Sequence, residues 1–154
     1  MQYWLFKTEP DAFSIDDLAT RAKQTEHWDG IRNYQARNFL RDQVKLGGKV
    51  FIYHSSCKEV GIAALAEVVK EAYPDHTQFD PESHYYDPKS TTDNPRWVMV
   101  DVKFIEKFPA VLALKKIKTM AEINEVGLVK KGHRLSIMPV NENEFSALLQ
   151  AAKA

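Results

Sequence analysis

The sequence has little cysteine, no long apolar run and no net charge, and each shortage excludes a class of protein. Cys57 is the only cysteine, so no disulfide forms within the chain and a zinc site made of cysteines is excluded. The longest apolar run, residues 61–66, is far shorter than a membrane span, and the first residues lack the features of a signal peptide. We therefore expect a cytoplasmic protein with no membrane partner.

The charges balance, with 21 basic and 21 acidic residues among 154. This balance excludes a polybasic tail and any partner held mainly by bulk electrostatic attraction. Hydrophobic residues make up 44% of the chain, which excludes a disordered protein. The length suits a single domain, here residues 1–154, whose core needs no disulfide or metal.

The order of apolar and polar residues predicts an α+β protein. Alternating patterns predict strands over residues 3–8, 49–54, 60–72, 96–108 and 134–140. Capping residues predict helices over 15–23, 34–43 and 119–127 and from 142 onward, and Pro109 should end the fourth strand. Strands interleaved with helices indicate a curved mixed sheet or small pseudo-barrel flanked by helices.

No familiar catalytic motif is present: there is no phosphate loop, dinucleotide fingerprint, nucleophile elbow or zinc-binding helix. The five histidines are scattered over different predicted elements, so we expect neither a metal site nor a cofactor. The run His54-Ser55-Ser56-Cys57 gathers a base and possible nucleophiles, but neighbours on a strand point to opposite faces. Hydroxyl groups bonded to the backbone at a strand end are the favoured interpretation, and a hydrolase remains an alternative.

Three segments combine polar side chains with large aromatics at predicted loops. They are Trp4 with Lys7-Thr8-Glu9-Pro10, Trp28-Asp29-Gly30-Ile31-Arg32-Asn33, and Tyr85-Tyr86-Asp87-Pro88 followed by Trp97. A planar ligand needs a flat face on which to stack and polar groups that read its edge. Trp4 and Trp97 could instead fill the core, and the tyrosines could anchor their loop.

These segments, with Phe51-Ile52-Tyr53-His54-Ser55-Ser56, Pro95-Arg96-Trp97 and Arg134-Leu135-Ser136, resemble the EVE domain family in order and spacing. The resemblance implies a PUA-like fold, a curved mixed sheet or pseudo-barrel with helices, similar to the YTH domain. It also implies a reader of modified bases rather than an enzyme, with modified cytosine in DNA as the leading ligand. DNA and RNA both remain open as partners.

On this basis we predict a pocket for one flipped or unpaired base between the sheet and the Trp28 loop. Trp28 and one of Trp4, Tyr53 or Trp97 would stack on the base. Asp29 or Glu9 would accept a hydrogen bond from its amine, and Asn33, the Ser55 hydroxyl and backbone groups would read the rest of its edge. The predicted base-binding residues are Trp4, Glu9, Trp28, Asp29, Arg32, Asn33, Tyr53, Ser55 and Trp97.

Basic residues supply candidates for contacts with nucleic-acid phosphates. They are Arg32, Arg37, Lys115, Lys116, Lys118, Lys130, Lys131 and Arg134. Lysine pairs on helices are also common on solvated faces. Two further alternatives stay open: a small-molecule nucleoside- or nucleotide-binding protein or enzyme that uses the same pocket, and an interaction module without a ligand.

Overall fold

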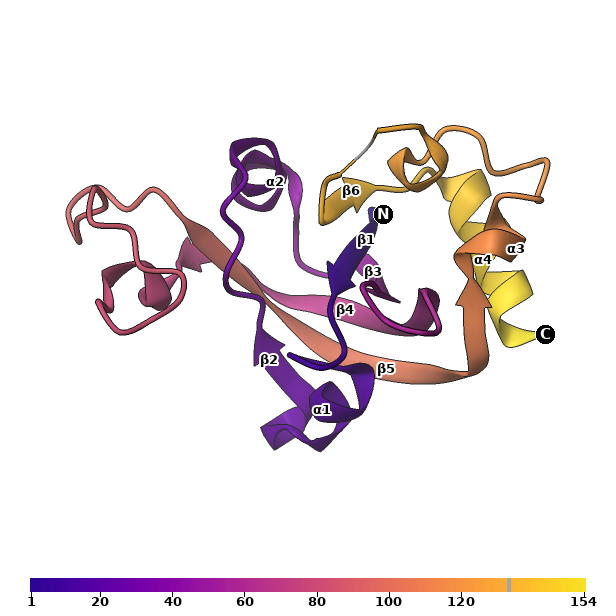
Figure 1. Ribbon diagram of the computed structural model, residues 1–154, viewed down its shortest axis with the longest axis horizontal. Helices are drawn as coiled ribbons and strands as arrows, with labels where there is room; N and C mark the ends of the chain where they lie inside the picture. Colours follow the sequence, from indigo (N-terminus) through magenta and orange to yellow (C-terminus); the bar gives the residue numbers. More distant parts are fainter. Residues whose placement is uncertain (133) are drawn as a thin grey trace.

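The computed structural model describes residues 1–132 and 134–154, and a six-stranded mixed sheet forms its centre (Figure 1). The strand order is β2-β5-β4-β3-β1-β6, with β1 and β3 parallel and the other neighbours antiparallel. The strands are β1 (Tyr3–Thr8), β2 (Thr25–His27), β3 (Lys49–His54), β4 (Gly61–Pro74), β5 (Val98–Ala113) and β6 (Ile137–Pro139). The predicted curved mixed sheet is confirmed.

Helices and single helical turns lie between the strands and after β6. They are α1 (Ile15–Thr20), α2 (Tyr34–Asn38), α3 (Leu114–Ile117) and α4 (Glu142–Lys153), with a π-helical turn at Phe39–Gln43 and 3₁₀ turns at Ala22–Gln24, His76–Phe79 and Gly127–Val129. Two predicted caps are confirmed: the Ser14 hydroxyl accepts from the Asp17 amide, and Asn141 caps α4. Among the described residues, no helix is long and apolar enough to cross a membrane.

The sheet buries side chains on both faces, because successive residues of each strand point to opposite sides. On β1, Phe6 joins a core with helices α1 and α2, whereas Leu5 joins a second core with α3 and α4. This arrangement explains why the inner strands are apolar along most of their length. The face that carries Phe6 is also the one on which the candidate site forms.

The sheet curls strongly. Strands β2 and β1 are separated by three other strands, yet the ring of Trp28, just after β2, lies 5.7 Å from that of Phe6 on β1. Register shifts between β4 and β5 mark bulges, which bend a sheet and increase its twist. The curvature therefore brings Trp28, in the loop after β2, into contact with β1.

Two predicted features are wrong. Pro109 does not end its strand, because β5 continues to Ala113. The pairing with β4 jumps from Ala64 opposite Lys107 to Ile62 opposite Leu112, so Pro109 lies in a bulge. A proline at a bulge removes no ladder hydrogen bond, which is why the strand continues past it.

The helix predicted over residues 119–127 does not form. The Thr119 hydroxyl donates to the Lys116 carbonyl instead of capping a following helix. The amides of residues 124, 125 and 126 donate to one carboxylate oxygen of the buried Glu144, at 2.9–3.1 Å. This carboxylate at the start of α4 satisfies the donors of the segment without a helix.

His54, the last residue of β3, gives a pH dependence to stability. Its Nε2 accepts a hydrogen bond from the Ile15 amide at 3.2 Å, and burial lowers the pKa of the imidazole, with Asp16 opposing and Lys107 assisting. In the unfolded chain the pKa of a histidine is about 6.5, so near and below this pH the unfolded chain binds a proton on His54 more readily than the folded chain does. The free energy of unfolding should therefore fall as the pH drops from 7.5 to 5.5.

Urea denaturation at both pH values tests this expectation. The amide oxygen of the variant His54→Gln can accept from the same donor. This variant should lose less stability between the two pH values than the parent chain loses. His84→Gln alters an exposed histidine and should keep the parental difference. An equal loss in the His54 variant and the parent would contradict the assignment.

Candidate functional site

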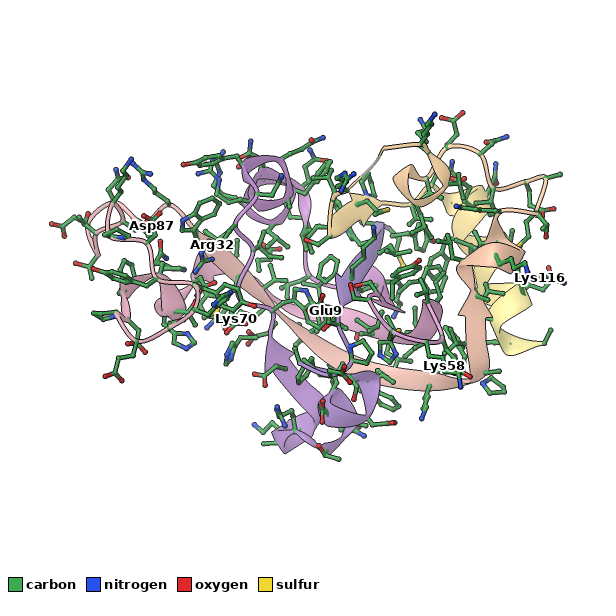
Figure 2. All side chains as sticks on the ribbon, viewed as in Figure 1. Glu9, Arg32, Lys58, Lys70, Asp87 and Lys116 are labelled. Carbon is green, nitrogen blue, oxygen red and sulfur yellow. The ribbon has the colours of Figure 1, made fainter. Side chains whose placement is uncertain are left out.

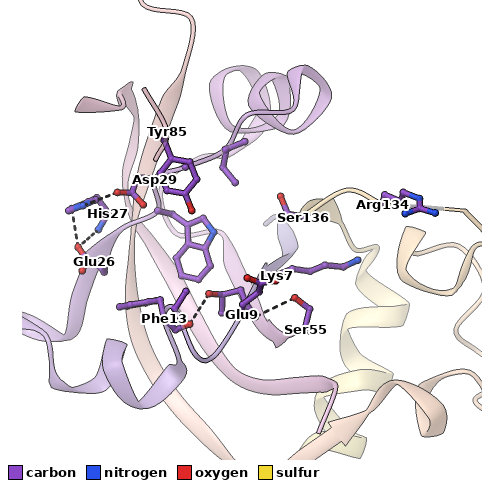
Figure 3. A pocket seen from close by; sticks show the side chains of 15 residues that line it. Lys7, Glu9, Phe13, Glu26, His27, Asp29, Ser55, Tyr85, Arg134 and Ser136 are labelled. Carbon is purple, nitrogen blue, oxygen red and sulfur yellow. Dashed lines mark hydrogen bonds and ion pairs between the residues drawn. The ribbon is translucent and has the colours of Figure 1, made fainter. Parts of the chain in front are cut away.

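A cavity of about 570 Å³ opens between the Trp28 loop and one edge of the sheet (Figure 3). That volume falls within the usual range of small-ligand sites. The lining combines aromatic rings, carboxylates, hydroxyls and two cations: Lys7, Thr8, Glu9, Ala12, Phe13, Glu26, His27, Trp28, Asp29, Gly30, Ile31, Ser55, Tyr85, Arg134 and Ser136.

Strand direction places several polar residues at the cavity. Because β1 and β3 are parallel, their carboxyl ends meet at the same edge, and the Ser55 amide donates to the Thr8 carbonyl at 2.9 Å. Antiparallel β6 begins at that edge, where the Ser136 carbonyl accepts from the Lys7 amide at 2.8 Å. The hydroxyls of Ser55 and Ser136 and the ammonium of Lys7 thus come from three neighbouring strands (Figure 3).

Trp28 forms the inner aromatic wall. Its amide donates to the Val100 carbonyl at 2.7 Å, which ties the loop to β5. Its indole packs against the rings of Phe6 and Phe13, with centroids at 5.7 and 6.0 Å, and only 6% of the residue is exposed. Trp28 therefore offers a rigid surface to the cavity rather than a freely exposed platform.

Tyr85 adds a further aromatic ring to the lining, and Gly30 allows its close approach to the Trp28 loop. Gly30 has φ of +79°, and a Cβ at this position would lie 2.7 Å from the Tyr85 ring. The Arg32 guanidinium donates to the Tyr85 carbonyl at 2.8 and 3.0 Å and lies 5.4 Å from its ring centre. Arg32 thus holds the long loop between β4 and β5, residues 75–97, against the Trp28 loop.

Asp75 joins the same two loops from within the core. The residue is completely buried, and its Oδ2 accepts from the Gly30 amide at 2.8 Å and from Arg32 Nη1 at 3.1 Å. Its Oδ1 accepts from the Thr77 amide at 2.8 Å. Burial alone would raise the pKa of Asp75, but the hydrogen bonds from Thr77 and Gly30, together with Arg32, lower it.

Asp29 carries a carboxylate at the cavity wall. Burial raises its pKa, as does the charge of Asp75, while His27 and His76 oppose the rise. Its Oδ2 lies 3.5 Å from His27 Nε2, and the other ring nitrogen of His27 lies 2.9 Å from Glu26 (Figure 3). About a third of the Asp29 side chain is exposed, so it is accessible as a hydrogen-bond acceptor.

The structure brings together four of the predicted base-binding residues, namely Glu9, Trp28, Asp29 and Ser55. Arg32 and Asn33 follow closely in sequence but lie outside the cavity lining. Arg32 forms the loop contacts described above, and the Asn33 side chain caps α2 by accepting from the Ala36 amide at 3.0 Å.

Three predicted aromatics are also outside the lining. Trp4 is 2% exposed, and its ring packs edge-on against Phe39. Tyr53 belongs to the core on the opposite face of the sheet. Trp97 donates its indole N–H to Asp87 at 2.8 Å and is covered by Tyr34, with ring centres 4.9 Å apart. All three stabilise the fold around the site.

The predicted phosphate-contacting residues are dispersed. Arg134 lines the cavity, whereas Arg37 lies on α2 and donates to the Arg96 carbonyl at 3.1 Å. Lys116 lies on α3 with Lys115, at the end of the molecule opposite Arg32 (Figure 2). A second cavity contains Lys118, Lys130 and Lys131, and it shares Lys7 with the first.

The main lining residues that were not among the predicted base-binding residues are Lys7, Phe13, His27, Tyr85 and Ser136. Lys7 and Tyr85 carried a signal, because they belong to the aromatic and polar segments, and Ser136 belongs to a segment that resembles the EVE family. Phe13 carried none, since its role depends on how the chain folds.

The alternative of a hydrolase at His54 gains no support from the local geometry. The His54 Nε2 already accepts from the Ile15 amide at 3.2 Å, and the Ser55 hydroxyl lies 3.5 Å from the Thr8 carbonyl. A general base needs its nitrogen free to take the proton of the nucleophile. Backbone hydrogen bonding at a strand end accounts for these side chains.

Comparisons with known proteins identify relatives across nearly the whole chain. The EVE domain model matches residues 2–151. The human protein named thymocyte nuclear protein 1 is 47% identical over 163 residues, which cover 96% of this chain and 72% of that protein. A crystal structure of a Pseudomonas putida protein has 49% identity and a TM-score of 0.93, and the match covers 97% of this chain and 99% of that one.

A further solved structure contains a ligand. It is described as human THYN1 protein in complex with 5-methylcytosine-containing DNA. That chain is 44% identical to this one, the TM-score is 0.91, and the match covers 100% of this chain and 99% of that chain.

Proposed function

Since the chain belongs to the EVE domain family, we propose that it is a non-catalytic reader of a modified base in DNA, with a 5-substituted cytosine as its ligand. The observation that carries the proposal is the cavity lined by Trp28, Phe13 and Tyr85, with the Asp29 carboxylate on its wall. The similar human protein bound to 5-methylcytosine-containing DNA supports the choice of base and of DNA.

The cavity suits one base outside the duplex stack. Trp28, Phe13 and Tyr85 provide aromatic surface, and stacking on such rings contributes about 1–3 kcal/mol per base. The cytosine amine is a donor, and Asp29 or Glu9 can accept from it, as carboxylates do in base readout. Ser55 and Ser136 can hydrogen-bond the remaining polar edge.

Lys7 and Arg134 supply the positive charge next to the cavity. Burial lowers the pKa of the Lys7 ammonium. Few cations are gathered here, so contacts with the phosphates should be few and the salt dependence of binding modest. This agrees with a chain whose net charge is zero.

Titration of labelled oligonucleotides tests the proposal. Duplexes that differ only at one cytosine, unmodified or 5-methylated, should differ in affinity by about fourfold, because burying one methyl contributes about 0.8 kcal/mol. Asp29→Asn should weaken binding to the methylated duplex about tenfold, because the amide replaces an acceptor oxygen with a donor.

Asp93→Asn removes a similar charge at an exposed position of the long loop and should bind like the parent. Equal affinity for both duplexes, together with unchanged binding by Asp29→Asn, would overturn the proposal. Two further titrations separate the alternatives. If free 5-methyldeoxycytidine bound as tightly as the methylated duplex, a small-molecule binding protein would be favoured. If a methylated RNA bound more tightly than the methylated duplex, RNA would be the partner.

A further inference from the structure

Two histidines and an aspartate from separate segments meet beside the cavity. His27 ends β2, Asp29 follows it in the Trp28 loop, and His76 begins the 3₁₀ turn His76–Phe79. Each offers one ligand atom, and these atoms lie within 4.8 Å of one another. The scattered histidines gave no sign of this cluster in the sequence, because the fold alone brings His76 next to His27.

Both ring nitrogens of His27 lie near carboxylates. Glu26 Oε1 lies 2.9 Å from Nδ1, and Asp29 Oδ2 lies on the other side of the ring, 3.5 Å from Nε2. A tetrahedral ion with bonds of about 2.0–2.1 Å separates its ligand atoms by about 3.3 Å, close to this distance.

The backbone that carries these ligands is held firmly. Buried Asp75 directly precedes His76, and its carboxylate accepts from the amide of Gly30, the residue after Asp29. The Asp75 and Glu26 carboxylates also add negative charge around the cluster. His76 itself is exposed, so its ring can shift toward an ion without displacing core side chains.

We propose that His27, Asp29 and His76 bind one divalent transition-metal ion of the zinc class, with Glu26 orienting His27. Two imidazoles and one carboxylate suit Zn²⁺, Co²⁺ or Ni²⁺, whereas Mg²⁺ and Ca²⁺ prefer oxygen ligands alone. A carboxylate that supports a ligating histidine is the usual outer partner in such sites. The fourth position is left to water, on the side where His27 and Asp29 line the cavity (Figure 3).

Calorimetric titration of the tag-free protein with Zn²⁺, without nucleic acid, tests the site. We expect one ion per chain, loss of measurable binding in His76→Ala, and weakening of about 10- to 100-fold in Glu26→Gln. Co²⁺ should give the visible absorption of a four- or five-coordinate ion, and His76→Ala should abolish it. Because His76 is exposed, this variant should fold, which far-ultraviolet circular dichroism can verify.

His84→Ala and Cys57→Ser are the matched controls, since each removes a potential ligand away from the cluster, and both should bind Zn²⁺ like the parent. A large excess of Mg²⁺ should not compete. Absence of Zn²⁺ binding, unchanged binding in His76→Ala, or an equal loss in His84→Ala would overturn the proposal. The result does not depend on base binding, so the two proposals can fail separately.

Discussion

Replacing Asp75 by asparagine should lower the free energy of unfolding by about 3 kcal/mol. The new amide keeps one oxygen for Thr77, but it turns an NH₂ group toward the Gly30 amide and the Arg32 guanidinium, which are both donors. The side chain is completely buried, so water cannot replace the lost acceptor. Urea denaturation followed by tryptophan fluorescence measures the change.

Asp93→Asn, the exposed replacement in the same loop, is the control and should alter stability by less than about 0.5 kcal/mol. The Asp75 variant should also bind the methylated duplex more weakly, because Asp75 fixes the backbone beside Asp29. A variant with parental stability would show that the two loops do not depend on this carboxylate.

Replacing Gly30 by alanine should destabilise the fold by about 3 kcal/mol and impair binding of the methylated duplex. About 1–2 kcal/mol comes from the left-handed backbone conformation at φ +79°, and the remainder from overpacking against Tyr85. The Tyr85 ring would have to move away from residue 30, since the new methyl would lie 2.7 Å from it, and this would change the cavity lining. Denaturation and oligonucleotide titration measure the two effects.

Gly47→Ala separates these causes. Gly47 has a similar φ, +82°, but a Cβ there would have no neighbour within 4 Å. It should therefore carry only the backbone cost of about 1–2 kcal/mol and bind DNA like the parent. If the two variants were equally stable and bound equally well, the contact between Gly30 and Tyr85 would have no role in the site.

Local sequence patterns predicted the regular elements well where short-range physics determines them. The ranges of β1 and β3 match the predicted strands, and the caps at Ser14 and Asn141 are confirmed, because alternation and capping depend only on near neighbours. The failures at Pro109 and Thr119 have a different origin. A bulge opposite β4 accommodates Pro109, and one carboxylate oxygen of Glu144 accepts from three amides of the segment after Thr119.

The candidate site was predictable in outline, since the Trp28 loop and Glu9 stood out by composition. The sequence of the Trp28 loop did not indicate which of its polar residues face the cavity, because Arg32 pairs with Asp75, a residue far along the chain. Trp97 likewise finds Asp87 across the long loop. Such pairings are determined by tertiary structure, and the local sequence does not predict them.

The position of β1 in the sheet has a consequence for the order of folding. This strand lies between β3 and β6, so Trp4 pairs with Val50 on one side and with Pro139 on the other. During synthesis the ribosome adds about 5–20 residues per second, so β1 keeps one unpaired edge for on the order of ten seconds. Pairings between such distant segments fold slowly. The nascent chain therefore exposes its apolar N-terminal strand until nearly all of the sheet has been made, and this interval is when it most needs protection from aggregation.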